Sequence, residues 1–561
     1  MTRVKLFLIV FVCICLQAVQ LVAEEDILLK AMEGELTRSF ELLEHAEETS
    51  LYFLQYAVTD EHKLNISASY GAIEKDEVKR RRYLTVDARV GSYKLDNTHE
   101  IRGAGFDFYM YMPHEAELPL EDNSDAIKSI IWKETDRAFK QARERFIKVK
   151  TDEIVKVAKR DTSPDFSKVA SQEYLGAKVD LEYDHEKWCE KLKRISSKFK
   201  KYSWIHDCSV GLRANVTNKY LVNSEGTIIK EGLVLCRVWI YSKTIADDGM
   251  ELFLHKGFDA HGFFNLPTED EISYALDSLI TNLKALRDAP LTEPYTGPAI
   301  LVNEASGVFF HEIFGHRIEG HRQKSEEFGQ TFTDKVGEKI LPEFLSVYDD
   351  PTLKESNGIE LRGYYKYDDE GVPGERVTIV KDGILKNFLM SRSPIESFPK
   401  SNGHGRRQHG RKVVSRQGNL IVETKKPIPY KKLQELLIEE CKKQGKPYGL
   451  IFYDISGGFT MLGRYFPQTF KVIPLLVSRL YPDGREEVVR GVDIVGTPLA
   501  SFGKIIATGD DTKPFNGTCG AESGLVPVSA ISPSILVEEI EVEKKEKAQD
   551  KPPLLPAPLY E

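Results

Sequence analysis

The chain has 561 residues, of which 41% are hydrophobic and 29% are charged, and its formal net charge is −9 at pH 7. This composition is that of an ordinary soluble globular protein, long enough for two or three hydrophobic cores. The mild negative charge, with no basic stripe along the sequence, argues against nucleic acid as the main partner.

The first residues have the layout of a secretory signal peptide. Arg3 and Lys5 precede an uncharged run over 6–16, and a polar stretch follows Ala23. The run is too short for a comfortable membrane span. We therefore expect a signal peptide over 1–23 and an exported chain, periplasmic or secreted, with an uncleaved N-terminal anchor as the alternative. We expect no stable membrane span after the leader is removed.

The next part of the chain, residues 24–290, predicts an N-terminal and middle region of mixed helices and strands. Apolar residues recur at helical spacing over 28–43 and again over 127–146, whereas 51–90 alternates like strands and 220–243 is rich in strand-forming residues. Thr268 and Glu271 form a capping box for a helix that runs to about Leu286.

A cluster of Pro and Gly residues between 290 and 298 marks a boundary, after which we expect a largely antiparallel β domain over 298–542. The sequence predicts a strand over 299–302, a helix that stops near Gly320, a helix over 430–444, and a last strand over 535–542. It also predicts hairpins that turn at Asp382-Gly383 and at Asp483-Gly484. Residues 543–561 are charged and then Pro-rich, which predicts a disordered tail. The expected fold class is α+β.

The most informative motif is His311-Glu312-Ile313-Phe314-Gly315-His316. It offers two imidazoles and a carboxylate, which are the groups of a metal-assisted hydrolase. Five steps of roughly 100° put the two imidazoles about 140° apart on a regular helix. Both can reach one ion only if the helix widens or ends between them, and Gly315 would permit this.

Seven cysteines are present, and five remain after the leader. Cys236 and Cys441 lie in apolar patterns and are expected in cores. Cys189 and Cys208 can pair in an oxidising compartment, and the sequence leaves that pairing open. Cys519 lies in a Gly-flanked context where a thiolate can approach a metal.

One segment, 394–416, is rich in basic residues. It includes Arg406, Arg407, His409, Arg411 and Lys412. Such a segment can contact the carboxylate of a peptide, but it is more often a solvated loop. We expect a solvated loop, with His404 and His409 as loop residues and not metal ligands.

From residue 298 onward the chain resembles the TldD/PmbA family of metallopeptidase-like proteins. The resemblance rests on four segments in the right order across the C-terminal half: 311–320, 367–371, 381–386, and 519–520 followed by 526–528 and the closing strand. The N-terminal half fits the family's layout without a matching motif.

The resemblance implies a zinc peptidase in which His311, His316 and Cys519 hold Zn²⁺ and Glu312 acts as the general base. It also implies a homodimer, or a heterodimer with a PmbA-like subunit, and a flexible or unfolded peptide as substrate. Glu319 and His321 are candidates to support the metal ligands, and His321 is also an alternative third ligand.

Three departures from the family pattern leave a second interpretation of the function open. The chain begins with a signal peptide although family members are typically cytosolic, His321 replaces an expected acidic residue, and Ala521 replaces a usual Lys. The alternative function is a non-hydrolytic subunit that binds or presents peptides in a TldD/PmbA-like complex.

Overall fold

The structure is a computed structural model that describes residues 26–46, 49–101, 114–155, 161–325, 328, 331–460, 462, 469–497, 502–545 and 555. The expected signal peptide and nearly all of the expected tail lie outside the described residues. Over the described ranges, no helix combines the length and apolar character that a membrane span requires.

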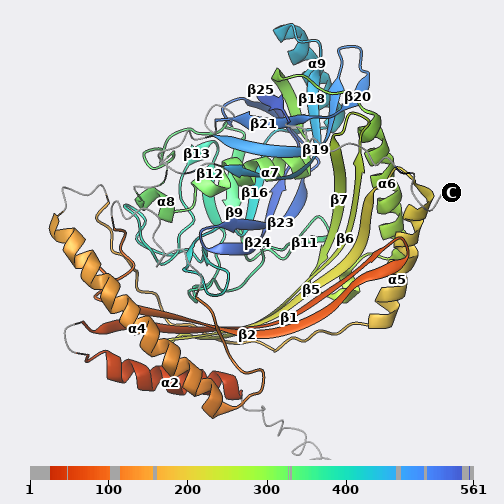
Figure 1. Cartoon of the computed structure of the whole chain (residues 1–561). Helices are drawn as coiled ribbons and strands as arrows, with labels where there is room; N and C mark the ends of the chain where they lie inside the picture. The colour runs from red at the N-terminus through yellow and green to blue at the C-terminus, as the bar shows by residue number, and fades with distance from the viewer. Residues whose placement is uncertain are drawn as a thin grey trace, which may run out of the picture.

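The N-terminal region is built around a long curved sheet, which Figure 1 shows wrapping around the C-terminal region. The β1–β2 hairpin turns at Tyr70 and Gly71, which both have positive φ as a tight two-residue hairpin turn requires. The strand order is β3-β2-β1-β5-β6-β4, and β7 pairs with β6. The strands are β1 Leu51–Ser69, β2 Ala72–Val90, β3 Ala116–Glu117, β4 Glu173–Leu175, β5 Asp207–Asn223, β6 Ile228–Ile245 and β7 Glu251–Ala260.

Two pairs of helices pack on this sheet and form separate cores with it. At one end lie α2 (Ile27–Leu43) and α4 (Ser124–Val155), as the helical periodicity predicted. At the other end, α5 (His185–Ser197) and α6 (Glu269–Asp288) cover the side of the sheet away from the C-terminal region. The predicted capping box of Thr268 and Glu271 begins α6. A short 3₁₀ turn follows α5 at Lys198–Lys201, and another precedes α6 at Phe263–Asn265.

The C-terminal region consists of two sheets with α7 (Asn303–Ile313) between them. The larger sheet has the order β17-β22-β25-β21-β19-β18-β8, with β20 beside β19, and most of its pairs are antiparallel. Its strands are β8 Tyr295–Leu301, β17 Pro427–Ile428, β18 Gly449–Thr460, β19 Phe470–Leu480, β20 Glu486–Val489, β21 Val492–Gly496, β22 Ile505–Gly509 and β25 Ile535–Lys544.

The smaller sheet has the order β13-β12-β9-β16-β24-β23. Its strands are β9 Leu345–Asp349, β12 Val377–Lys381, β13 Ile384–Leu385, β16 Asn419–Thr424, β23 Lys513–Ala521 and β24 Gly524–Ser532. The remaining elements are α8 His321–Lys324, α9 Tyr430–Gln444, a 3₁₀ turn at Gly315–Arg317, and the strand pairs β10 Glu355–Ser356 with β11 Ile359–Glu360 and β14 Gly405–Arg406 with β15 Val414–Ser415. The α+β expectation is confirmed, and α9 matches its predicted bounds.

Three predicted boundaries differ from the structure. The motif helix ends at Ile313 and not near Gly320. The second strand of the hairpin that turns at Asp483-Gly484, expected over 486–494, is divided into β20 and β21 by Gly491, whose φ is positive. The last strand continues to Lys544, two residues into the expected tail. The predicted domain boundary falls where α6 ends and β8 begins, and the division into domains stays a prediction.

Candidate metal centre

Helix α7 carries His311 in its last turn, and its end brings His316 back toward the same point. After Ile313 the chain leaves the α-helix and forms the 3₁₀ turn Gly315–Arg317. The ring centres of His311 and His316 lie 5.2 Å apart, with 70° between their planes. The helix therefore ends between the two histidines, as their spacing required.

Gly315 is needed at this break because another side chain occupies the space beside it. A Cβ on Gly315 would lie 1.9 Å from the side-chain oxygen of Gln417, which is buried. The Gln417 amide in turn donates to the carbonyl of His311, at 3.4 Å. The glycine thus permits a close approach that ties the end of α7 to the segment before β16.

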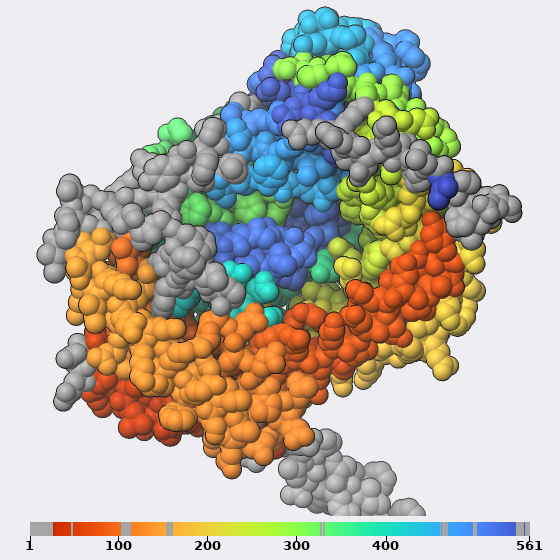
Figure 2. Space-filling model, in the orientation of Figure 1, coloured from red at the N-terminus to blue at the C-terminus, as the bar shows by residue number. Residues whose placement is uncertain are grey.

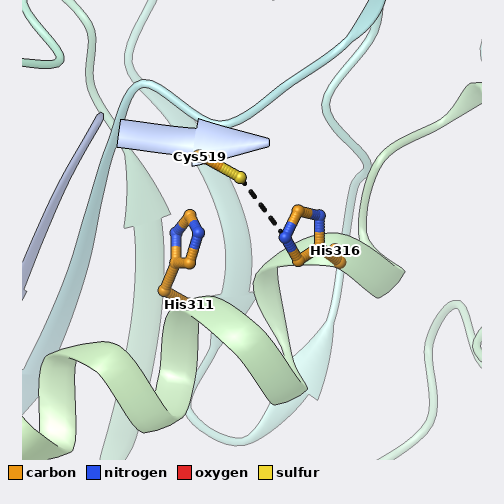
Figure 3. A group of neighbouring side chains, drawn as sticks. All are labelled: His311, His316 and Cys519. Carbon is orange, nitrogen blue, oxygen red and sulfur yellow. Dashed lines mark hydrogen bonds between the residues drawn. The ribbon is translucent and has the colours of Figure 1, made fainter. Parts of the chain in front are cut away.

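The third donor comes from the smaller sheet of the C-terminal region. Cys519 lies on β23, paired with Val526 of β24, and its Sγ is 3.3 Å from Nε2 of His316. The donor atoms of His311, His316 and Cys519 all lie within 4.8 Å of one another. Figure 3 shows the sulfur pointing toward the space between the two rings. The structure therefore brings together three residues that are far apart in the chain.

The charges within this cluster favour the metal-binding form of the cysteine. Burial alone would raise the thiol pKa, but the facing His316 and His311 outweigh it and hold the pKa of Cys519 well below its usual value. Burial alone would lower the pKa of His316, yet Cys519 and Glu319 raise it. The thiolate is the form that ligates metals, whereas the imidazoles must be neutral, so metal binding here would release protons.

The donor set fits zinc. Each of the three residues is only 5% exposed, and Nδ1 of His311 is buried with no hydrogen-bond partner among the described residues. Imidazole nitrogen and thiolate are ligands that zinc prefers, and three protein ligands leave a fourth position open, as in catalytic sites. Zinc would give a partner to donors that otherwise lie buried together at a cost in free energy.

Glu312 is partly buried on the turn between the two histidines. Burial raises the pKa of its carboxyl, while His311, His316 and the nearby backbone of Gly458 act in the opposite direction. A Cβ on Gly458 would lie 3.2 Å from Cγ of Glu312. Strand β18 therefore passes close to the carboxylate at a position where a side chain would crowd it.

Glu319 supports the histidine from behind. This carboxylate is fully buried and lies 3.3 Å from Nδ1 of His316. Arg322 donates to it at 2.9 Å, and the guanidinium of Arg416 lies 3.5 Å from its other oxygen. Burial alone would raise the pKa of Glu319, but His316 and Arg322 lower it to about 2. The carboxylate is thus held ionised, in the form that orients a ligating imidazole.

His321 lies outside the cluster of donor atoms. Its Nε2 is 2.5 Å from the carboxylate of Glu522, which also accepts a hydrogen bond from Arg322 at 2.9 Å. Glu522 lies in the turn between β23 and β24, so the pair fixes the hairpin that carries Cys519. His321 therefore holds this hairpin through its contact with Glu522, and it does not lie among the three donor residues.

The expectation of a solvated basic loop over 394–416 is wrong. Arg416 and His404 are fully buried, and Arg406 is nearly so. Arg416 donates to the carbonyl of Cys519 at 2.9 Å, and His404 pairs with the buried Asp349 at 3.1 Å. A buried carboxylate and a carbonyl elsewhere in the chain bind these side chains, and neither partner is close in sequence. Arg416 and Gln417 were missed for that reason.

The other four cysteines within the described ranges are free thiols. Cys189 and Cys208 do not form a disulfide, and Cys236 and Cys441 are buried as their apolar patterns predicted.

Residues 294–544 match the family model described as the PmbA/TldA metallopeptidase C-terminal domain. A metalloprotease of Archaeoglobus fulgidus is 29% identical over 277 residues, which are 49% of this chain and 59% of that protein. A zinc metalloprotease TldD homolog of Saccharolobus solfataricus is 26% identical, over 44% of this chain and 51% of that protein. The chain thus spans little more than half the length of these relatives.

The fold of almost the whole chain has a solved counterpart. The crystal structure of TldE from Thermococcus kodakarensis aligns with a TM-score of 0.59 over 91% of this chain and 100% of that one, at 15% identity. The shared architecture therefore includes the N-terminal sheet, where no sequence motif matched. Residues 294–544 thus carry the PmbA/TldA metallopeptidase C-terminal domain, which places this part of the chain in the TldD/PmbA family.

Proposed function

We propose that the chain is a zinc-dependent peptidase whose centre is formed by His311, His316 and Cys519, with Glu312 as the general base. The single observation that carries the proposal is the convergence of these three donors, from α7 and β23, beside an acidic side chain. The names of the relatives, metalloprotease and zinc metalloprotease, support it.

Each residue has a definite task in this proposal. Zinc held by the three donors would supply a Lewis acid that lowers the pKa of water and polarises a carbonyl. Glu312 accepts the proton of the attacking water and delivers it to the leaving amine. Its pKa, which burial raises, brings this carboxyl closer to the pH at which a base of this kind works. Glu319 keeps His316 oriented through Nδ1.

The position of the centre favours flexible substrates. Figure 2 shows the strands of the C-terminal region at the back of a hollow, bordered by the β1–β2 hairpin and by α4. The three donors are almost buried. We therefore propose that an extended or unfolded peptide, and not a folded protein, reaches Glu312.

We also propose that the chain is exported and works as a dimer, either with itself or with a PmbA-like subunit. The proposal of export rests on the layout of residues 1–23. The likeness to TldE supports a TldD-like and TldE-like pairing, since this chain carries the His-Glu-x-x-x-His motif.

The test is a Glu312→Gln variant, measured for zinc content and for cleavage of an unstructured peptide. Glutamine keeps the shape but cannot accept the proton, so turnover should fall by roughly 10²–10⁴-fold while bound zinc stays the same. Glu304→Gln is the matched control on the same helix, where the carboxylate pairs with Lys256 and Lys513, and it should keep both properties.

A zinc-loaded wild type that cleaves no unstructured peptide, alone or with a PmbA-like partner, would support the alternative, a subunit that only binds or presents peptides. The departure at His321 no longer favours that alternative, because the side chain has a structural partner in Glu522.

A further inference from the structure

A second group of metal-binding side chains lies on the N-terminal region, outside the proposed active centre. Among the described residues, Asp76, His185 and Cys189 are the other group whose donor atoms all lie within 4.8 Å of one another. Asp76 is on β2, and the other two residues are on α5, which covers the outer side of the long sheet.

The three side chains are mounted on elements that are fixed to each other. His185 is the first residue of α5, and Cys189 follows four residues later, so both face the same side of the helix. The Asp184 side chain caps this helix by accepting from the backbone N–H of Lys187, and Ser196 at the far end accepts from the N–H of Gly71 in the hairpin turn. The cap fixes the start of the helix, and the bond between Gly71 and Ser196 joins the helix to the hairpin.

The carboxylate and the thiol approach the same nitrogen. Asp76 Oδ2 is 2.8 Å from Nε2 of His185, and Cys189 Sγ is 3.6 Å from that same atom. In a thiol–imidazole–carboxylate catalytic relay, the two partners would bind opposite ring nitrogens. Convergence on one nitrogen is the arrangement of three ligands around a common point.

The distances suit a tetrahedral ion. With zinc–sulfur and zinc–nitrogen bonds of about 2.3 and 2.05 Å, the two donor atoms should lie roughly 3.5 Å apart, close to the 3.6 Å between Cys189 and His185. The carboxylate oxygen would have to move back from the imidazole by roughly half an ångström to fit the same geometry. An exposed aspartate on a strand can make that movement.

We propose that Asp76, His185 and Cys189 form a second site for a divalent, thiol-binding cation of the zinc type, with water in the remaining position. The mixed nitrogen, sulfur and oxygen donors favour zinc over calcium or magnesium, which prefer oxygen alone. The side chains of His185 and Asp76 are 47% and 40% exposed, whereas Cys189 lies beneath them at 9%. An ion can therefore enter from solvent and be held by the thiolate below.

This site would be structural. It would join the start of α5 to the exposed part of β2. Strand β2 pairs with the short strand β3 only at Tyr83 and Leu84, so its exposed part has no described strand on that side. A cation there would stabilise the folded state through a tie that the unfolded chain lacks. It shares no ligand with the proposed active centre, since the two groups have no residue in common.

The experiment is an anaerobic titration of the reduced chain with Co²⁺, followed by displacement with Zn²⁺. In a Cys519→Ser background, the near-ultraviolet thiolate-to-cobalt absorption should still appear, saturate near one equivalent and disappear on addition of Zn²⁺. In the Cys519→Ser/Cys189→Ser double variant this absorption should be lost. His62→Ala in the Cys519→Ser background is the matched control, because His62 also faces an aspartate, Asp180, on the outer side of the sheet. It should leave the absorption unchanged.

Cobalt absorption that survives the loss of Cys189, or that never appears in the Cys519→Ser background, would overturn the proposal. Should the Cys519→Ser chain fail to fold, zinc content decides the matter by equilibrium dialysis. The wild type should bind about two equivalents, and Cys189→Ser alone should bind about one and keep full peptide cleavage. Equal zinc content in these two chains would also overturn the second site, without affecting the proposal for the active centre.

Discussion

The two donor clusters use similar side chains in opposite surroundings. His311, His316 and Cys519 are buried between two sheets, and a carboxylate held by two arginines lies behind them. Asp76 on β2 and His185 at the start of α5 are open to solvent, whereas the thiol beneath them is buried. The identity of the donor residues alone therefore does not distinguish a catalytic metal site from a structural one.

The difference lies in what each site provides besides ligands. The buried centre has an ionisable Glu312 next to the donors and a carboxylate that orients one imidazole. At the surface cluster, the bond from the N–H of Gly71 to Ser196 joins α5 to the hairpin that carries Asp76. The first arrangement suits chemistry on a substrate, and the second suits stability of the fold.

The largest expected effect comes from removing one histidine at each site. His316→Ala should abolish peptide cleavage and lower zinc affinity at the buried centre by more than the roughly 10–100-fold that loss of an outer partner costs. His185→Ala should reduce zinc content while leaving cleavage unchanged. Zinc analysis and peptide turnover on the same preparations check both. Equal losses of turnover in the two variants would break the comparison.

The next effect concerns the carboxylate behind the ligands. Glu319→Gln should weaken zinc binding at the buried centre by about 10–100-fold, because His316 loses the charge that orients its ring. Competition with a chelator of known affinity measures this. Glu423→Gln, which disturbs only a surface pair with Arg376, is the control and should bind zinc like the wild type. An unchanged affinity in Glu319→Gln would show that the carboxylate only fills space.

The smallest effect is on acid stability, measured in excess chelator so that zinc loss does not contribute. The pKa of Glu319 in the folded chain, about 2, lies below that of an unfolded glutamate at roughly 4.3. Its stabilising contribution is therefore present above the unfolded value and is lost as the pH falls toward 2.

Glu319→Gln lacks this titration. The gap in unfolding free energy between wild type and variant should thus narrow by about 3 kcal/mol from neutral pH to about pH 2, as measured by urea denaturation. A gap that stays constant over this range would contradict the ion network around Glu319.

The sequence predicted well those elements that depend on residues close together in the chain. The capping box of Thr268 began its helix, the spacing of His311 and His316 required the helix to widen or end, and the helix over 430–444 has its expected bounds. Each of these features depends on residues within a turn or two, and the physics of helices decides them.

Contacts between residues that are far apart in the chain could not be predicted from the sequence. The basic segment over 394–416 was expected in solvent, yet Arg416 is buried because Glu319 and the carbonyl of Cys519 lie beside it in the fold. Nothing near Arg416 in the chain indicates those partners. The cluster of Asp76, His185 and Cys189 could not be predicted for the same reason. Asp76 comes close to the other two residues only when the hairpin and α5 pack together.

The most direct test of the account is anomalous diffraction at the zinc edge from crystals of the zinc-loaded chain. The account predicts a strong peak within bonding distance of His311, His316 and Cys519, next to Glu312. Density for zinc that lies elsewhere, with these three side chains bound to other partners, would contradict it.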